Sequence, residues 1–445
     1  MTAFRTPAPM WRLCLAAYST LYSAAVLVWA VAAKLGLTRR GKQTPILPRL
    51  GRRSDLAAHA VPQGTRVWVH AVSVGEVNAV RPLVDALAGR PGIRVMLSTV
   101  TSTGRQVAAD RFGSRVDLIP FPLDVGWICR RFLRHFRPHL ILLAESELWP
   151  NFLAAAAGEG IPVLLVNGRI SDRSFGRYRR LSWFFRPLVR RISHACMQSR
   201  QDKERLLALG ADPERVNWAG NLKFDCTVEP DPSFEPLRRL VVDVLKPRAD
   251  SLLWVCGSTK PGEEEILLPI FHRLRQEFPG LSLLLAPRHP HRAPEVLELA
   301  RQQGLNAERR TCLVPGSVTN GLQVLVLDTV GELSRLYELA DLVFVGGSLV
   351  PEGGQNLIEP AFFGKPILVG PHMSNFQEVT RVFREAYGVL QVKDAGELEQ
   401  RMRDLLRDAH AREWLGRNAR KVIRQSQGAV QRTLEIVDRY LEVRQ

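Results

Sequence analysis

The sequence of 445 residues is poor in cysteine and lacks several common functional motifs. Its six cysteines are scattered singly, with no CxxC pair and no Cys/His spacing of the kind that binds zinc. This usage excludes a disulfide-rich secreted fold and favours reduced thiols in a cytoplasmic compartment. The sequence also lacks the GxxxxGK[ST] phosphate loop and any Asp-x-Asp pair that would hold a nucleotide-bound metal ion. We therefore expect no metal site.

Acidic residues are also fewer than basic ones. The chain has 44 Asp and Glu residues against 61 Lys and Arg, a formal net charge of +17. Such a basic chain is expected to meet an anionic partner, which is a nucleic acid, an anionic membrane surface or a phosphorylated substrate.

Long apolar runs are absent except for one at the amino end. Residues 13–33 read LCLAAYSTLYSAAVLVWAVAA, without a charge, which is long enough to cross a bilayer as a helix. A cleaved signal peptide is the alternative, but the run is longer than a usual signal core. Basic residues flank it, and more of them follow than precede it. We therefore predict an amino-terminal membrane anchor over 1–37, spanning or partly inserted, with the rest of the chain in the cytoplasm.

Beyond a basic connector, short apolar runs alternate with helix-like segments. This alternation predicts an α/β fold with parallel sheets covered on both faces. The proline-rich stretch at 229–237 is typical of a linker. The prediction is two doubly wound, Rossmann-like domains over 45–228 and 238–425, facing a cleft, with a final helix over 426–445. Ligands of such sheets bind beyond the carboxyl ends of the strands. The seven strands expected in the first domain are 66–72, 94–99, 116–120, 140–144, 162–167, 194–198 and 215–218. The strands expected in the second are 252–256, 281–286, 323–327, 341–345, 366–369 and 388–392.

One carboxylate stands where the first of these strands turns into a helix. The stretch VWVHAVSVGE (67–76) ends at Glu76, three residues after Ser73. This spacing fits a capping box, in which the glutamate reaches back to a free backbone donor. It fits equally a general base that projects from a strand end toward a ligand. The local sequence leaves both interpretations open.

Two further stretches place charged side chains at strand ends in the first domain. LLAESELWP (142–150) puts Glu145 and Glu147 between a strand and a helix. AGNLKFD (219–225) puts Lys223 after the last strand. A single lysine of this kind is usually a solvated surface residue. We expect these groups to lie near Glu76, because the carboxyl ends of parallel strands share one edge of the sheet.

The second domain carries features suited to phosphate. Arg288 follows a strand in LLLAPRHPH (283–291), and a guanidinium matches phosphate geometry. The glycine-rich stretch VFVGGSLVPEGGQNLIEP (343–360) joins a strand to a helix that begins near Asn356 and Glu359. Such loops commonly turn backbone N–H groups toward an anion, so we predict phosphate binding there.

Taken together, these stretches resemble the 3-deoxy-D-manno-octulosonic acid (Kdo) transferases of Gram-negative bacteria. The resemblance implies a GT-B glycosyltransferase that moves Kdo from CMP-Kdo to the lipid A precursor, of lipid IVA type, with inversion, in lipopolysaccharide biosynthesis. It implies no metal and no cofactor besides the donor, and a place on the cytoplasmic face of the inner membrane. The motifs that carry it are HAVSVGE (70–76), TVTSTG (99–104), AESELWPN (144–151), NGRIS (167–171), GNLKFD (220–225), GSTKPGEEE (257–265), PRHP (287–290), DTVGEL (328–333) and FVGGSL with GGQNLIEP (344–360).

Roles for individual residues follow from the same resemblance. It makes Glu76 the catalytic base, with Glu145 and Lys223 stabilising the transition state. Two departures from relatives are visible, NLIE at 356–359 where some have NPLE, and Gly168 where some have alanine. The residues that match the CMP-binding positions of the family are Pro287, Arg288, Val330, Gly331, Glu332, Asn356, Leu357, Ile358 and Glu359.

Two rival interpretations remain beside this one. Another GT-B transferase that acts on a membrane lipid would share the fold and the glycine-rich loop. A nucleic-acid-binding protein would account for the charge of +17 and for the basic, aromatic segment RYRRLSWFFRPLVRR (177–191). The same segment suits docking on an anionic membrane surface, with aromatic rings at headgroup depth. The anchor favours the membrane, and we expect no nucleic-acid partner.

Overall fold

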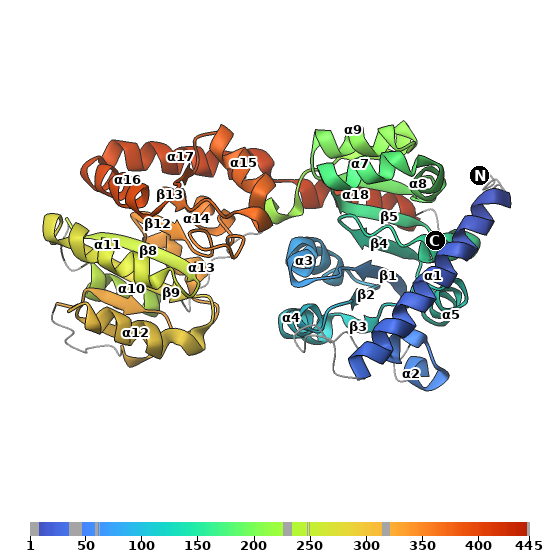
Figure 1. Ribbon diagram of the computed structural model, residues 1–445, viewed down its shortest axis with the longest axis horizontal. Helices are drawn as coiled ribbons and strands as arrows, with labels where there is room; N and C mark the ends of the chain where they lie inside the picture. The colour runs from blue at the N-terminus through green and yellow to red at the C-terminus, as the bar shows by residue number, and fades with distance from the viewer. Residues whose placement is uncertain are drawn as a thin grey trace. The chain divides into compact units, whose positions relative to one another are not determined.

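The chain folds into two compact units (Figure 1). Unit 1 comprises Met1–Cys226 and Ser426–Gln445, and unit 2 comprises Thr227–Gln425. A computed structural model describes residues 9–34, 47–57, 61, 63–225, 234–246, 248, 250–313 and 321–442. Most of the predicted linker therefore lies outside the described residues, and the first helix of unit 2 already begins at Glu235.

Unit 1 is built on a parallel sheet of seven strands in the order β3-β2-β1-β4-β5-β6-β7. All seven strands predicted for this part of the chain are present. Their apolar residues alternate between the two faces, so each face supplies its own core. The strands are β1 (Thr65–His70), β2 (Ile93–Thr99), β3 (Asp117–Pro120), β4 (Leu140–Ala144), β5 (Val163–Gly168), β6 (His194–Met197) and β7 (Val216–Trp218).

Helices cover both faces of this sheet. Helices α3, α4 and α18 pack on one face, and α5, α6, α8 and α9 on the other. Val77, Val80, Val84 and Leu87 form an apolar stripe at helical spacing, which is the buried side of α3. The helices of unit 1 are α1 (Pro9–Lys34), α2 (Arg53–Ala57), α3 (Val74–Ala88), α4 (Ser102–Phe112), α5 (Gly126–Phe136), α6 (Pro150–Gly158), α7 (Asp172–Arg180), α8 (Ser182–Val189), α9 (Arg200–Ala208) and α18 (Ala429–Glu442).

Unit 2 repeats the architecture with the strand order β10-β11-β9-β8-β12-β13-β14. Strand β10 was not predicted, because its three residues at the sheet edge include two charged side chains and form no apolar run. The strands are β8 (Leu252–Thr259), β9 (Leu281–Pro287), β10 (Ala307–Arg309), β11 (Val324–Val326), β12 (Leu342–Val345), β13 (Ile367–Val369) and β14 (Leu390–Gln391). The helices are α10 (Glu235–Leu245), α11 (Glu264–Glu277), α12 (Ala293–Gln302), α13 (Leu333–Leu336), α14 (Ile358–Phe362), α15 (Gln377–Glu385), α16 (Ala395–Arg407) and α17 (Ala409–Ser426).

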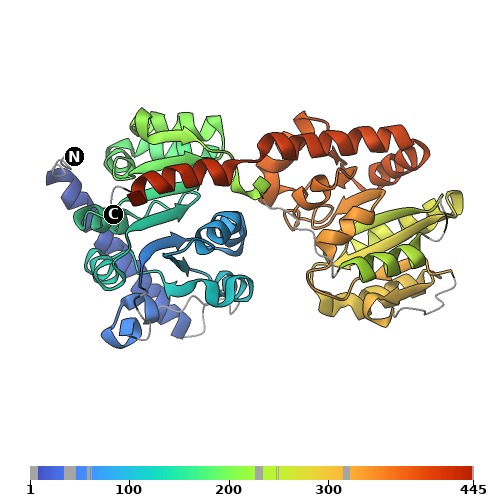
Figure 2. The same cartoon turned by 180° about the vertical axis from the view of Figure 1, so that it is seen from behind.

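The last helix of the chain belongs to unit 1. The final helix predicted over 426–445 begins at Ala429, and Gly428 separates it from α17 with a φ of +90° that a residue with a side chain rarely adopts. The following helix, α18, lies against the sheet of unit 1 (Figure 2). The Asp225 carboxylate accepts hydrogen bonds from the N–H groups of Gly428 and Val430 at the start of α18. An acidic group at a helix amino end is favourable, so the GNLKFD motif holds the returning helix.

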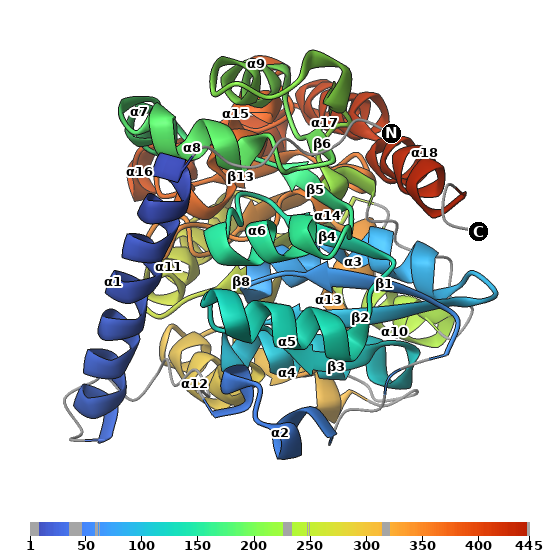
Figure 3. The same cartoon turned by 90° about the vertical axis from the view of Figure 1, so that its right-hand side faces the viewer.

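The predicted membrane anchor forms helix α1, but the structure does not support a spanning segment. In the part of the chain that the structure describes, no helix has the length and apolarity needed to cross a bilayer. One side of α1 instead packs on unit 1 beside α6 and α8 (Figure 3). Trp11 is only 4% exposed, and Leu15, Tyr22 and Val26 continue the same stripe at helical spacing.

Part of the basic, aromatic segment 177–191 packs into the core of unit 1. Leu188 and Val189 are buried, and Phe184 stacks on Trp11 with the ring centroids 6.3 Å apart. The apolar residues of α8 therefore form an ordinary core stripe. Trp183 remains 53% exposed, and α7, which carries three of the six arginines of the segment, buries no residue.

Candidate active site

Glu76 lies in the first turn of α3, close beyond the end of β1. Ser73 is the N-cap residue of the helix, and its Oγ accepts the N–H of Glu76 at 3.5 Å. The carboxylate reaches back, with Oε2 accepting the N–H of Val72 at 2.8 Å and Oε1 accepting the hydroxyl of Ser73 at 3.2 Å. The capping interaction suggested by the sequence therefore forms, although the backbone N–H that Glu76 binds belongs to Val72 and not to Ser73.

The environment of Glu76 makes it a weaker acid than usual. Burial raises the pKa of its carboxyl to about 7, the N–H of Val72 opposes that rise and the charge of Glu145 adds to it. The hydroxyl of Ser73 and the ammonium of Lys223 lower the same pKa. A carboxylate whose pKa lies near neutrality is suited to accept a proton during a reaction.

Glu145 and Lys223 come from other strand ends and meet near Glu76. Their side chains form an ion pair with 3.9 Å between Nζ and Oε1, and both are about one-fifth exposed. Glu145 follows β4 directly with φ +53°, a left-handed conformation that non-glycine residues seldom adopt and that is often found at functional sites. The predicted convergence of these three residues is thus present, since the charges of both others act on Glu76.

Asn167 at the end of β5 places the segment that carries Lys223. The Asn167 residue is 1% exposed, and its Oδ1 accepts the N–H of Leu222 at 3.0 Å. The 3-10 turn Leu222–Asp225 begins there, so the lysine is held by a buried amide two strands away. Sequence reasoning missed Asn167; its place in NGRIS at a strand end was the available signal.

Glu147 is a second carboxyl group with altered acidity. Burial, and then the charge of Glu76, raise its pKa to about 7. The indole N–H of Trp149 lowers that pKa, and Glu145 adds a small further rise. Sequence analysis placed Glu147 at the strand end but assigned it no role. The structure adds it to the group of charged residues around Glu76.

The predicted nucleotide residues of unit 2 lie beyond the carboxyl ends of neighbouring strands. Arg288 follows β9, is exposed, and donates its backbone N–H to Thr259 at the end of β8 over 2.8 Å. The pKa of His289 is lowered by burial and then by the positive charges of Lys260 and Arg288. This edge of the sheet therefore concentrates positive charge, as an anionic ligand requires.

Three N–H groups of the glycine-rich loop are bound by a carboxylate of the chain. Glu263, which is fully buried, accepts the N–H groups of Gly347, Ser348 and Leu349 at 2.6, 3.0 and 2.9 Å. A carboxylate of the chain thus occupies these three amides, and phosphate binding by the rest of the stretch 343–360 stays a prediction. Glu263 lies in the GSTKPGEEE motif, whose acidic run gave no hint of this contact.

The remaining predicted residues flank that loop. Asn356 donates from Nδ2 to Glu359 at 3.0 Å and accepts the N–H of Ile358 at 3.1 Å, which fixes the start of α14. Glu332 accepts hydrogen bonds from Arg310 at 3.2 Å and from the hydroxyl of Thr329 at 2.5 Å. Pro287, Leu357 and Ile358 are buried, whereas Val330 and Gly331 are exposed.

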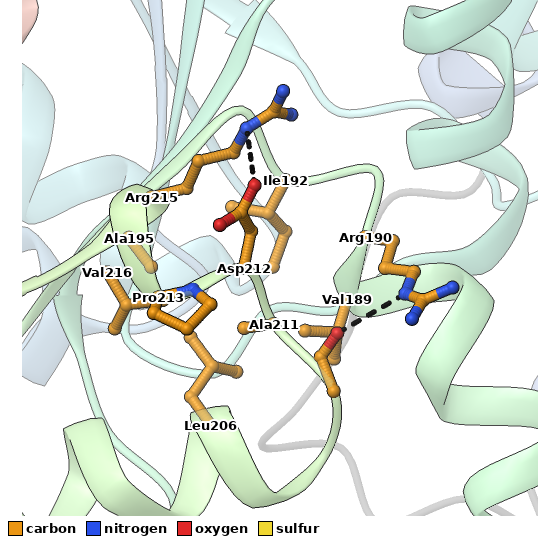
Figure 4. A pocket seen from close by; sticks show the side chains of 11 residues that line it. Val189, Arg190, Ile192, Ala195, Leu206, Ala211, Asp212, Pro213, Arg215 and Val216 are labelled. Atoms are coloured by element: carbon orange, nitrogen blue, oxygen red, sulfur yellow. Dashed lines mark hydrogen bonds and ion pairs between the residues drawn. The ribbon is translucent and has the colours of Figure 1, made fainter.

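A cavity of about 420 Å³ lies elsewhere in unit 1, before the amino ends of β6 and β7 (Figure 4). Arg190 and Arg215 stand at its margin, where they contact the carbonyl of Gly210 at 3.4 Å and Asp212 at 3.5 Å. It lies at the opposite edge of the sheet from Glu76 and contains none of the predicted site residues. Over the described residues, no cluster of three or more His, Cys, Asp or Glu side chains is arranged to hold a metal ion.

Comparisons with known proteins identify the family. Residues 35–226 match the family model described as 3-deoxy-D-manno-octulosonic-acid transferase (kdotransferase). A 3-deoxy-D-manno-octulosonic acid transferase of Haemophilus influenzae is 36% identical over 86% of this chain and 88% of its own length. One from Bordetella pertussis is 34% identical over 88% of this chain and 91% of its own. The chain belongs to the Kdo transferases. It is therefore a glycosyltransferase.

A solved structure supports the fold of this Kdo transferase. The UDP-GlcNAc 2-epimerase of Neisseria meningitidis bound to UDP-GlcNAc is similar with a TM-score of 0.52 over 84% of this chain and 100% of its own. At 14% identity the likeness concerns the fold alone, which is two Rossmann-like units. The departure at Gly168 has a packing explanation, since a Cβ there would lie 2.5 Å from the Sδ of Met197.

Proposed function

We propose that the protein transfers Kdo from CMP-Kdo to a hydroxyl of the lipid A precursor, of lipid IVA type, with inversion and without a metal ion. The acceptor oxygen forms a bond to the anomeric carbon of Kdo while the bond from that carbon to the phosphate oxygen of CMP breaks. CMP departs with the electron pair, and the hydroxyl proton goes to Glu76. The observation that carries this proposal is the half-buried carboxylate of Glu76, with its pKa of about 7, beside Glu145 and Lys223.

Glu145 and Lys223 are proposed to act on the charges that develop during transfer. The sugar becomes positive as CMP departs, and a carboxylate nearby stabilises that charge. The ammonium of Lys223 pairs with Glu145, and it lowers the pKa of Glu76 so that the base is available near neutral pH. These roles are the ones that family resemblance suggests for both residues.

The donor is proposed to bind unit 2 through its nucleotide. Arg288, the neighbouring cationic groups and the segments 330–332 and 356–359 supply the contacts. Because Glu263 occupies the amides of 347–349, the negative phosphate of CMP is proposed to be neutralised by side chains more than by that loop.

The protein is further proposed to work at the cytoplasmic face of the inner membrane, on the membrane surface. The outward side of α1 exposes Leu13, Leu21, Leu27 and Val28, each at 66% or more. Trp183 is exposed on α8, whose Phe184 stacks on Trp11 of α1. An apolar helix face with nearby arginines suits shallow insertion into an anionic bilayer.

The decisive experiment compares Glu76→Gln with Glu204→Gln, an exposed glutamate on α9. Purified full-length protein is incubated with CMP-Kdo and a lipid A precursor, with and without EDTA, and the product lipid is weighed by mass spectrometry. We expect Glu76→Gln to lose about 100-fold or more in kcat, while Glu204→Gln and EDTA have no effect. Full activity of Glu76→Gln would leave this residue with its capping role alone. No product from the wild-type protein would refute the proposed reaction.

A further inference from the structure

Asp124 is a fully buried carboxylate that lies between helices α6 and α1 of unit 1. It lies in the loop that precedes α5. Its carboxylate accepts the N–H of Asn151 at 3.2 Å and that of Phe152 at 2.8 Å, both in the first turn of α6. Helix α6 has no side-chain cap of its own, since Trp149 occupies the N-cap position without such a bond. Asp124 therefore satisfies the free donors that begin α6 and fixes where the helix starts.

Helix α1 reaches the same carboxylate with polar side chains. Burial raises the pKa of the Tyr18 hydroxyl, and the charge of the nearby Asp124 carboxylate raises it further. The Ser19 hydroxyl shares its proton between the carbonyl of Leu15 at 2.8 Å and Oδ1 of Asn151 at 3.0 Å. Asn151 in turn donates from Nδ2 to the carbonyl of Asp124 at 2.6 Å. Two consecutive residues of α1 thus contact the two partners that define the start of α6.

The loop between β4 and α6 carries the charged residues of the candidate active site. Residues 145–149 join the end of the strand to the start of the helix and include Glu145 and Glu147. The strand end is held by the sheet on both sides. The other end of the loop is held by the start of α6, and the ring of Trp149 packs on Phe121 with centroids 5.6 Å apart. Any shift of the first turn of α6 therefore moves this loop.

We propose that α1 is part of the support of the active site, and that Tyr18 and Ser19 are positioning residues that hold the loop 145–149 through Asp124 and Asn151. These polar side chains of α1 face the rest of unit 1, where they meet polar partners. This arrangement is expected of a helix docked on protein rather than of one surrounded by lipid. The inference rests on the proposed function for the role of Glu145, but the structural link from α1 to α6 does not.

The test uses the full-length variants Tyr18→Phe and Ser19→Ala, alone and combined. Ser23→Ala is the matched control, because Ser23 lies one turn along α1, is exposed, and donates only to the carbonyl of Ser19. Amide hydrogen exchange is followed in peptides covering 145–153, and kcat and KM are measured with CMP-Kdo and a lipid A precursor. For the double variant we expect exchange at the start of α6 to accelerate about tenfold and kcat to fall about tenfold. We expect the KM for CMP-Kdo to change by less than about twofold.

Each outcome decides a different part of the inference. Exchange and kcat equal to those of Ser23→Ala would overturn it. Faster exchange with unchanged kcat would leave α1 a purely structural element and would also refute a positioning role. If the double variant does not fold, Ser19→Ala alone still decides, because it removes one hydroxyl from a helix surface. If the wild-type protein transfers no Kdo, the proposed reaction fails while the exchange experiment still tests the link from α1 to α6.

Discussion

Glu76 combines two roles that the sequence presents as alternatives. Each of its carboxylate oxygens accepts one hydrogen bond, from Val72 and from Ser73. A carboxylate oxygen has two acceptor positions, so each oxygen retains one for a substrate hydroxyl. The capping interaction therefore orients the carboxylate without using it up, and burial keeps its pKa near that of a useful base.

Glu147 is expected to weaken the fold at alkaline pH. Its pKa of about 7 in the folded protein exceeds the ordinary value of 4.5. Its contribution to the free energy of unfolding is therefore favourable at low pH and is lost as the pH rises through 7. We predict that Glu147→Gln raises the free energy of unfolding at pH 8 by about 1 to 3 kcal/mol, seen as a higher Tm, with little change at pH 4.5.

Thermal unfolding of both proteins between pH 4.5 and 8.5 checks this prediction. Glu204→Gln serves as the control, because that side chain is exposed and should give no pH-dependent difference. A Tm for Glu147→Gln at pH 8 that equals or falls below that of the wild type would contradict the account.

At the scale of elements, the glycine-rich loop of unit 2 is shaped by a glutamate from another segment. Glu263 lies just after β8, yet its carboxylate binds three consecutive N–H groups beyond β12. Burial raises its pKa, and the N–H groups of Gly347, Leu349, Lys260 and Ser348 oppose that rise. The contact joins two strand ends and holds the loop on which the proposed nucleotide contacts depend.

Two variants test separately whether Glu263 stabilises the loop and whether Arg288 binds the nucleotide. Glu263→Gln replaces an acceptor with a donor-bearing amide among three N–H groups, so we expect a loss of about 2 kcal/mol or more in stability and weaker CMP binding. Arg288→Ala should weaken CMP binding about tenfold without changing the Tm, because its side chain is exposed. Calorimetry with CMP alone and thermal unfolding measure both effects. Glu265→Gln, an exposed neighbour, is the control.

Unchanged CMP affinity in Arg288→Ala would remove that residue from the proposed donor site. A stable Glu263→Gln with an unaltered Tm would show that the loop does not depend on the buried carboxylate.

At the scale of the whole molecule, the net charge of +17 favours adsorption to an anionic surface. We predict that Arg179→Glu combined with Arg180→Glu lowers binding of the full-length protein to phosphatidylglycerol-containing vesicles by about tenfold or more at low salt. Higher salt should reduce the binding of the wild type as well. Removing α1 is no test, because Trp11 and its neighbours belong to the core of unit 1.

Vesicle sedimentation between about 50 and 300 mM salt measures this effect. Arg238→Glu combined with Arg239→Glu on α10 of unit 2 changes the net charge by the same amount and is the matched control. Equal loss of binding in both double variants would show that net charge, and not the surface of α7 and α8, governs adsorption.

The sequence by itself determined the elements and the family. All the strands in the described part of the chain except β10 were predictable, because buried parallel strands are short apolar runs and such runs are local. The nine ordered motifs sufficed to identify a Kdo transferase. The strand-end position of Glu76, Glu145 and Lys223 predicted their convergence, since parallel strands bring their carboxyl ends to one edge.

Only the tertiary structure decided which polar groups satisfy one another. The apolar run 13–33 looks the same whether it faces lipid or protein, and its docking depends on Asp124 and Asn151, more than a hundred residues away. Glu263 and the loop it binds are separated by 84 positions, and no local pattern links them. Burial, which sets the pKa of Glu76 and Glu147, is likewise a property of the packed unit. Hydropathy and spacing indicate the secondary structure and the burial that each segment favours. Contacts between residues distant in sequence form only when the chain packs.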